Sequence, residues 1–212
     1  MRADPWSAAD WREEMGEVME QHSLNRRDAV AMLLEDRGDL LVVTGLGSPS
    51  YDAMAAGDHD SNYYLWAAMG SAAMIGLGLA KAQPDRSVLV ITGDGELMMG
   101  VGGLATISVA KPANLTIAVL DNGLFGETGL QRSHTGHGVE ISRIAESMGF
   151  VWTGVVRTDD DVDDLRGRLG DRNGPRLATI KIKGENPPRV LPPRDGVYIK
   201  NRFRSSLGFK PI

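Results

Sequence analysis

Two apolar runs of strand length, residues 87–92 and 115–120, constrain the fold of this chain most strongly. Both are rich in β-branched side chains, as expected of strands buried inside a sheet. Each run is followed within two residues by a polar side chain next to glycine, Asp94 after the first and Asn122 after the second. In an open α/β sheet, ligands bind at the edge where the strands end. The pattern therefore predicts a ligand site that contains Asp94 and Asn122.

The remaining sequence alternates helical and strand patterns, which predicts an α/β protein with a single open, mostly parallel sheet and helices on both faces. The expected helices cover residues 25–36, 67–81, 98–110, 141–148 and 160–169, and the expected strands cover 39–44, 62–66, 87–92, 115–120, 151–156 and 176–183. The glycine-rich segment 45–50 is expected to be a loop. We expect a helical extension over 1–23, one domain over 24–185 and an extended, Pro-rich tail over 186–212.

Composition excludes several classes of protein. The chain has no cysteine, so disulfides, thiolate metal sites and cysteine nucleophiles are ruled out. Its net charge of −5 does not favour nucleic acid or an anionic membrane surface as a partner. No apolar run reaches the ~18 residues of a membrane span, and the first residues lack the apolar segment of a secretory signal. We therefore expect a cytoplasmic protein with neither a nucleic-acid nor a membrane partner.

The residue types around the two strand ends favour a metal-bridged diphosphate. A carboxylate at Asp94 and an amide oxygen at Asn122 are hard ligands suited to Mg²⁺, which usually takes its other ligands from phosphates and water. Glycine at 93 and 95 lets the backbone turn sharply and approach a ligand closely. The absence of a G-x-x-x-x-G-K-[ST] pattern argues against a P-loop nucleotide site.

Together these residues resemble a known fingerprint. Gly93-Asp94-Gly95 is followed, after the 26 residues 96–121, by Asn122, and this spacing resembles the cofactor motif of thiamine-diphosphate-dependent decarboxylases and carboligases. Five further segments resemble the β subunit of sulfopyruvate decarboxylase and the C-terminal half of phosphonopyruvate decarboxylase: residues 69–72, 83–86, 104–107, 121–122 and 131–136. The resemblance covers about residues 24–185, with a weaker similarity in 198–203.

The resemblance implies a role for each matching residue. Asp94 and Asn122 would bind Mg²⁺ through their side chains and Leu124 through its carbonyl. Met69 would wedge between the two rings of thiamine diphosphate, and the carbonyl of Ala67 would accept a hydrogen bond from the cofactor's 4′-amino group. The residues implied to lie around the diphosphate are Gly70, Ser71, Gly93, Gly95 and Glu96, of which Gly95 and Glu96 would offer backbone N–H groups.

The family activates its cofactor with a glutamate from a separate pyrimidine-binding domain, which needs roughly 170 further residues. This chain has room for one α/β domain, so we expect a partner chain, an α subunit, to supply that glutamate in an α₂β₂ or larger assembly. Glu127 is the weaker alternative as activator because it lies on a different motif.

Two histidines are candidate catalytic residues. His134, in the polar loop after Asn122, can act on a substrate anion or a proton, form a metal pair with His137, or be an ordinary loop histidine. His59 carries the same open choice between catalysis and a loop position. Arg132 can neutralise a substrate sulfonate, phosphonate or carboxylate, or be a solvated loop charge.

Four functions compete at this point. The leading one is a decarboxylase subunit for a small anionic 2-oxo acid of the sulfopyruvate or phosphonopyruvate type. The second is a carboligase subunit that forms acyloins. The third, a 2-oxo-acid:ferredoxin oxidoreductase β subunit, is disfavoured by the length and by the lack of cysteine. The fourth is a non-catalytic module that binds a diphosphate.

Overall fold

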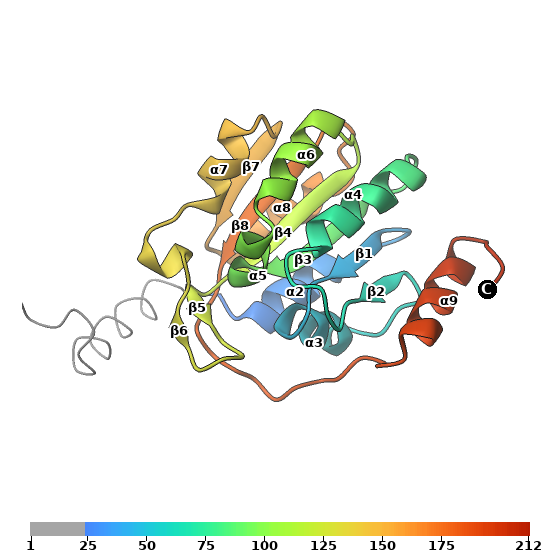
Figure 1. Cartoon of the computed structure of the whole chain (residues 1–212), viewed down its shortest axis with the longest axis horizontal. Coiled ribbons are helices and arrows are strands. Elements are labelled where there is room, and N and C mark those ends of the chain that lie inside the picture. Colours follow the sequence, from blue (N-terminus) through green and yellow to red (C-terminus); the bar gives the residue numbers. More distant parts are fainter. Residues whose placement is uncertain (1–23) are drawn as a thin grey trace, which may run out of the picture.

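Six parallel strands form the centre of the computed structural model, which describes residues 24–212 (Figure 1). The helix expected over residues 1–23 lies outside the described part of the chain. The sheet order is β2-β1-β3-β4-β8-β7, and every neighbouring pair is parallel. The strands are β1 (Leu41–Thr44), β2 (Asn62–Tyr64), β3 (Val88–Gly93), β4 (Leu115–Asp121), β7 (Trp152–Val156) and β8 (Arg176–Lys181). The predicted parallel α/β sheet is confirmed.

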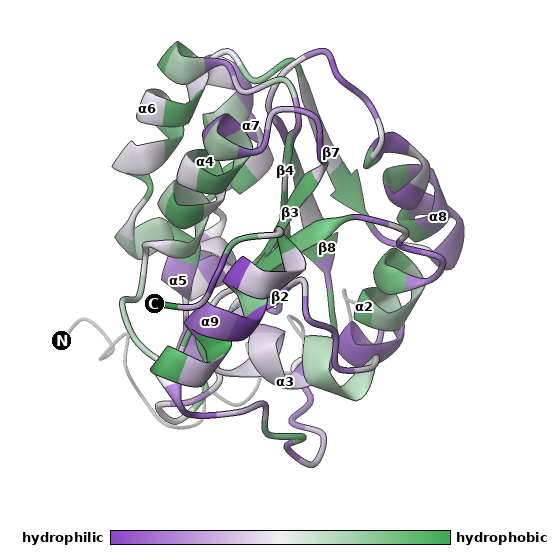
Figure 2. Cartoon of the chain, turned by 90° about the vertical axis from the view of Figure 1, so that its right-hand side faces the viewer, coloured by the Kyte–Doolittle hydropathy of each residue, from purple (hydrophilic) through white to green (hydrophobic). Residues whose placement is uncertain are grey.

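Helices cover both faces of the sheet, as Figure 2 shows with α4, α6 and α7 on one side and α2 and α8 on the other. The helices are α2 (Arg26–Leu34), α3 (Ser48–Ala55), α4 (Ala72–Ala82), α5 (Asp94–Met99), α6 (Gly102–Ala110), α7 (Ile141–Ser147), α8 (Asp159–Arg168) and α9 (Gly196–Ser206). The side chain of Asn25 caps the start of α2 by accepting hydrogen bonds from the N–H groups of Arg27 and Asp28. None of the helices in residues 24–212 is long and apolar enough to cross a membrane.

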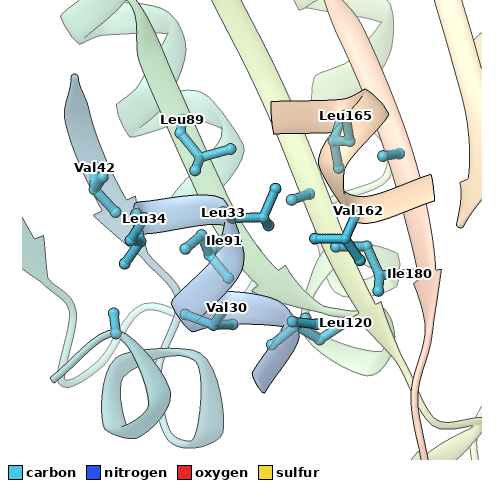
Figure 3. Close-up of a cluster of buried hydrophobic side chains, with 14 of the residues drawn as sticks. Val30, Leu33, Leu34, Val42, Leu89, Ile91, Leu120, Val162, Leu165 and Ile180 are labelled. Carbon is cyan, nitrogen blue, oxygen red and sulfur yellow. The ribbon is translucent and has the colours of Figure 1, made fainter. Parts of the chain in front are cut away.

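Two apolar layers, one on each face, hold the sheet between the helices. β3 contributes Leu89 and Ile91 to the layer under α2 and α8 (Figure 3), and Val88 and Val90 to the layer under α4 and α6. All seven residues of β4 are buried, as expected of a central strand covered on both sides. The sheet is therefore a rigid base for the loops at its carboxyl edge.

Three expected boundaries were wrong. The segment 45–50 is not all loop, because α3 begins at Ser48 with Pro49 in its first turn, where proline's fixed φ suits a helix start. The helix expected at 98–110 is two helices, α5 from Asp94 and α6 from Gly102. The helix expected from residue 67 begins only at Ala72, so residues 67–71 are free to form a loop.

The C-terminal segment runs back across the domain and ends in a helix. The extended part, seen below α3 in Figure 1, is fixed by hydrogen bonds from Arg27 Nη2 to the carbonyl of Pro188, 2.8 Å, and from Trp66 Nε1 to that of Pro193, 2.6 Å. α9 then packs on β2, with the ring of Phe203 edge-on to Tyr63. The sequence had suggested only extended chain here.

Candidate functional site

A cavity of about 160 Å³ opens at the carboxyl edge of the sheet. Strands β3 and β4 are neighbours, with Gly93 paired to Leu120, so the chain delivers Asp94 and Asn122 side by side. Both line the cavity, together with Met69 from the loop after β2. Residues 69, 94 and 122, which are far apart in sequence, thus surround one space.

Asp94 is a buried carboxylate, with 3% of its surface exposed. Its Oδ2 accepts hydrogen bonds from the hydroxyls of Ser133 and Thr135, and no lysine or arginine of residues 24–212 forms an ion pair with it. Burial, and then the nearby charge of Asp121, raise the pKa of Asp94 to about 6 against the relief those hydroxyls give. A bound cation stabilises the ionised form of a buried carboxylate that lacks a cationic partner.

Asp121 is a second buried carboxylate close to Asp94. Its Oδ2 lies 2.5 Å from Nζ of Lys181, its partner in register on β8, and its Oδ1 accepts from the N–H of Gly123 at 3.0 Å. The hydroxyl of Thr135 lies between the two acids, 2.7 Å from Asp121 Oδ1 and 2.8 Å from Asp94 Oδ2. Asp121 thus has a cationic partner in Lys181, whereas Asp94 has none among residues 24–212.

Ionisation of Asp94 should lower the stability of the apo chain as pH rises from 4 to 6, and the Asp94→Asn variant should lack this contribution. Because the folded chain keeps the Asp94 proton up to about pH 6 while the unfolded chain releases it near 4, folding binds a proton between these values. At pH 7.5 the variant should be more stable by up to about 3 kcal/mol, the equivalent of two pKa units, and at pH 4 the two should match. Urea unfolding in EDTA measures this, and parallel stability curves would contradict it.

The oxygens around Asp94 suit Mg²⁺ better than a transition metal. Asn122 contributes an amide oxygen that also accepts the N–H of Leu124 at 2.9 Å, and Leu124 itself lines the cavity. Within residues 24–212 no three His, Cys, Asp or Glu side chains gather as a metal site. A single carboxylate with amide and carbonyl oxygens is the type of donor set that leaves positions for phosphate and water.

The two glycines of the motif serve different purposes. Gly93 has φ −94° and ψ 159°, so the turn does not require glycine there, contrary to the expectation from sequence. A Cβ on Gly93 would meet no atom within 4 Å, and the residue lines the cavity. A Cβ on Gly95, by contrast, would lie 2.6 Å from Cε1 of Phe125. Gly95 is needed for packing, and Gly93 leaves space free at the edge of the cavity.

Gly93→Ala should therefore fold normally and bind its ligand poorly. The backbone accepts alanine and no protein atom obstructs the methyl group, so the melting temperature should change by less than about 2 °C, as for a substitution without strain. A methyl group in the ligand's space should weaken cofactor binding by roughly tenfold or more, in line with the cost of overpacking. Gly95→Ala is the comparison and should lower the melting temperature. Wild-type affinity in Gly93→Ala would show that the ligand does not approach this backbone.

The loop of residues 67–71 brings Met69 to the cavity. Met69 is 45% exposed and lines the cavity, so its side chain is accessible to a bound ligand. Gly70 has φ +85°, which favours glycine, and a Cβ on Gly100 would lie 2.0 Å from its carbonyl oxygen. The backbone of Gly100 therefore supports the loop. Ala67 is exposed, and Ser71 is the N-cap residue of α4.

The side chain of Glu96 fills the space between three loops. Its Oε2 accepts the hydroxyl of Thr92 at 2.9 Å and would lie 1.8 Å from a Cβ on Gly45. Burial raises the pKa of Glu96 to about 6, against hydrogen bonds from Thr92 and the backbone of Gly93 and Gly70. From the sequence, only the backbone N–H of Glu96 was expected to contribute to the site. In the structure, its carboxyl group also links β3 to the loop that carries Met69.

The structure separates the two candidate histidines. His134 is exposed and does not line the cavity, but its ring stands edge-on to Phe125, which does, with centroids 6.3 Å apart. His59 precedes β2 and so lies at the opposite edge of the parallel sheet, where its Nδ1 accepts the N–H of Ser61 at 3.0 Å. The structure thus corrects the placement of His59, because the amino ends of the strands face away from the cavity.

Two other polar residues of the loop after Asn122 lie in different surroundings. Arg132, on the short strand β6 (Gln131–Arg132), is half-buried and is not among the residues that line the cavity. It pairs antiparallel with β5 (Leu124–Phe125), and the 3-10 helix η1 (Thr135–His137) follows. Glu127 does line the cavity, and its Oε2 lies 2.7 Å from Nη2 of Arg189.

Several cavity residues were not predicted from sequence. Leu46, Ser48 and Pro49 line the cavity from the segment after β1, and the glycines at its start were the signal that could have identified them. Arg26 also lines it, at the first position of α2. Nothing in the sequence separates Arg26 from its neighbour Arg27, so only the fold could show which of the two faces the cavity.

Comparison with known proteins agrees with this geometry. The profile of the family described as "Thiamine pyrophosphate enzyme, C-terminal TPP binding domain" matches residues 50–180. Sulfopyruvate decarboxylase subunit beta of Methanothermobacter thermautotrophicus is 35% identical over 85% of this chain and 94% of its own length. Phosphonopyruvate decarboxylase of Streptomyces viridochromogenes is 34% identical over 85% of this chain but only 45% of its own length.

A solved structure shows the same fold. Benzoylformate decarboxylase from Polynucleobacter necessarius superposes with a TM-score of 0.62 at 19% identity, over 80% of this chain and 35% of that one. The chain thus spans about a third of that protein's length. It belongs to the thiamine pyrophosphate enzyme family. Within this family, the chain is a subunit of a thiamine-diphosphate-dependent decarboxylase.

Proposed function

We propose that this chain holds the diphosphate and Mg²⁺ of thiamine diphosphate for the decarboxylation of a small anionic 2-oxo acid. The observation that carries the proposal is the single cavity at the carboxyl edge of the sheet, which Asp94, Asn122 and Met69 all line. The side chains of Asp94 and Asn122 and the carbonyl of Leu124 would hold the metal. Gly70, Ser71, Gly93, Gly95 and Glu96 would surround the diphosphate.

The residues present fit the cofactor and its metal. Asp94 is a buried carboxylate with no cationic partner in residues 24–212, and burial together with the charge of Asp121 raises its pKa. A bound Mg²⁺ would stabilise its ionised form. The open space beside Gly93 leaves room for a close approach. When bound, the thiazolium ring of thiamine diphosphate accepts the electrons left by departing CO₂.

Met69 and the loop that carries it would set the cofactor's shape. The exposed thioether side chain of Met69 lines the cavity and would wedge between the two rings, which would fix their relative orientation. Glu96 and Gly100 fix the loop from below, which keeps Met69 in position. Holding two reacting groups together in this way makes proton removal effectively intramolecular. Ala67 lies on the same loop, and its carbonyl would accept a hydrogen bond from the cofactor's 4′-amino group.

The substrate class follows from the relatives. Proteins named sulfopyruvate decarboxylase subunit beta are 29–37% identical to this chain, and phosphonopyruvate decarboxylases are 34% and 36% identical. Both names specify a 2-oxo acid with a second, strongly acidic group. We therefore infer that this enzyme acts on a substrate of that type. A carboligase is the second candidate, because the same site would serve either reaction.

A second chain would complete the site. The relatives named subunit beta imply an alpha subunit for those proteins, and we propose one here that supplies the activating glutamate in an α₂β₂ or larger assembly. The chain spans 45% of the phosphonopyruvate decarboxylase it resembles, which is consistent with two halves that are separate in one protein and joined in another.

Product analysis tests the proposed reaction. The chain, reconstituted with its partner, thiamine diphosphate and Mg²⁺, should release CO₂ and an aldehyde from sulfopyruvate or phosphonopyruvate, and much less from pyruvate. Addition of an aldehyde acceptor should leave the CO₂-to-aldehyde ratio near one. An acyloin as the main product would establish the carboligase instead, and turnover of pyruvate equal to that of the acidic substrates would refute the substrate class.

A further inference from the structure

Arg26 is a buried guanidinium in the wall of the cofactor cavity. It is the first residue of α2 and has 6% of its surface exposed. Its Nη1 donates to the hydroxyl of Ser48 at 2.5 Å, and its Nε lies 2.9 Å from Oδ2 of Asp52. Ser48 lines the same cavity as Arg26, so the two side chains form one polar patch on its wall.

The charge around Arg26 is not balanced by the protein. Asp52, which is fully buried, is shared by Arg26 and Arg27, whose Nε lies 3.4 Å from Asp52 Oδ1. Two guanidinium groups and one carboxylate leave an excess of one positive charge. Glu127 also acts on Arg26, but it is paired with Arg189. A buried charge without a full counter-charge is costly, which indicates that an anion completes the cluster.

The guanidinium of Arg26 has N–H groups that donate to no acceptor in residues 24–212. Within residues 24–212, Nη1 donates to Ser48, Nε lies 2.9 Å from Asp52 Oδ2 without forming a hydrogen bond, and no acceptor is found for Nη2. Arginine is suited to phosphoryl oxygens because its planar N–H groups can form charge-assisted hydrogen bonds with them. Arg27, by contrast, is 25% exposed and directs Nη2 to the carbonyl of Pro188; it does not line the cavity.

The charge of Arg26 favours the phosphate part of the cofactor over its rings, because a guanidinium pairs with phosphoryl oxygens. Ser48 follows β1, and β1 is the direct neighbour of β3, the strand that ends at Asp94. The Arg26–Ser48 patch therefore lies one strand away from the metal ligand. Leu24, just before α2, bridges to Ile182 beyond β8, which holds this end of α2 over the strand ends.

We propose that Arg26 binds the terminal phosphate of thiamine diphosphate, with Ser48 and Asp52 holding its guanidinium in place. This inference rests on the proposed function, since it names a further residue for the same cofactor. Mg²⁺ and Arg26 would then neutralise the diphosphate from two sides, and a phosphate oxygen would accept a hydrogen bond from Nη2 of Arg26.

Affinities for thiamine diphosphate and thiamine monophosphate test the assignment. They are measured by calorimetry with Mg²⁺ on the full chain, with its partner present, for wild type, Arg26→Met and the matched control Arg27→Met. Arg26→Met should weaken diphosphate binding by about 10- to 100-fold, the effect of losing a hydrogen bond between charged groups, with a much smaller change for the monophosphate. Arg27→Met loses the same partner, Asp52, and should bind diphosphate within about threefold of wild type.

Other outcomes would overturn the assignment. Equal losses for both ligands in Arg26→Met would indicate a structural role, and wild-type cofactor affinity with a raised KM for the substrate would assign Arg26 to the substrate. Arg26→Lys, which keeps the charge, covers the case in which Arg26→Met fails to fold, and it should fall between wild type and Arg26→Met. If wild type itself binds no thiamine diphosphate, the proposed function fails rather than this inference alone.

Discussion

Asp94→Ala should bind thiamine diphosphate at least about 100-fold more weakly than wild type in the presence of Mg²⁺. Loss of a residue that only orients a metal ligand typically costs 10- to 100-fold in metal affinity, and Asp94 is proposed as a ligand itself. It is the one carboxylate of the cavity that is buried, lies beside Asn122 and has no cationic partner in residues 24–212. Calorimetric titration with and without Mg²⁺ measures the effect.

The variant is expected to fold, which makes the result interpretable. Removing a buried, uncompensated carboxylate relieves its repulsion with Asp121, although the hydroxyls of Ser133 and Thr135 lose their acceptor. Glu146→Ala, on the exposed side of α7, is a control that changes the net charge equally. If Asp94→Ala binds the cofactor with Mg²⁺ as tightly as this control, Asp94 is not a metal ligand.

The rate of decarboxylation should depend strongly on a partner chain. On its own the chain should decarboxylate its substrate at least about 1,000-fold more slowly than with its partner, within the range that general acid–base groups contribute. Three carboxylates line the cavity in residues 24–212. Asp94 faces Ser133 and Thr135, Glu96 is turned to Thr92 and the loop backbones, and Glu127 is paired with Arg189. We expect none of the three to activate the cofactor's pyrimidine.

Steady-state rates for the chain alone, the partner alone and an equimolar mixture measure this dependence. Glu127→Gln is the informative variant, because Glu127 is the cavity carboxylate nearest to solvent, with 46% exposure. In the mixture it should keep most of the wild-type rate. A chain that turns over alone at the rate of the mixture, or a Glu127→Gln variant that is inactive, would place the activating glutamate in this chain.

The sequence was sufficient for the sheet and for one half of the site. Buried parallel strands consist of continuous β-branched runs, which can be recognised without knowledge of their neighbours. Asp94 and Asn122 follow adjacent runs, so their convergence required only that β3 and β4 pair. Met69 could be found through a motif, since its loop belongs to the family resemblance.

Features that depend on contacts between distant segments could not be predicted. Arg26 and Arg27 are identical in sequence pattern, and only the packing of α2 on α3 decides which faces the cavity. His59 looked like His134 because a sequence does not show at which edge of the sheet a loop lies. Gly100 faces Gly70 across two loops. Helix α9 was not predicted, because the prolines before it indicate an extended chain.

The most direct test is calorimetric titration of thiamine diphosphate into the chain with its partner, in Mg²⁺ and again in EDTA. We propose that this chain anchors the cofactor through a metal at Asp94 and Asn122. We expect one cofactor bound per chain in Mg²⁺, with binding abolished in EDTA and in Asp94→Ala. Absence of heat in Mg²⁺, or equal binding in EDTA, would contradict it.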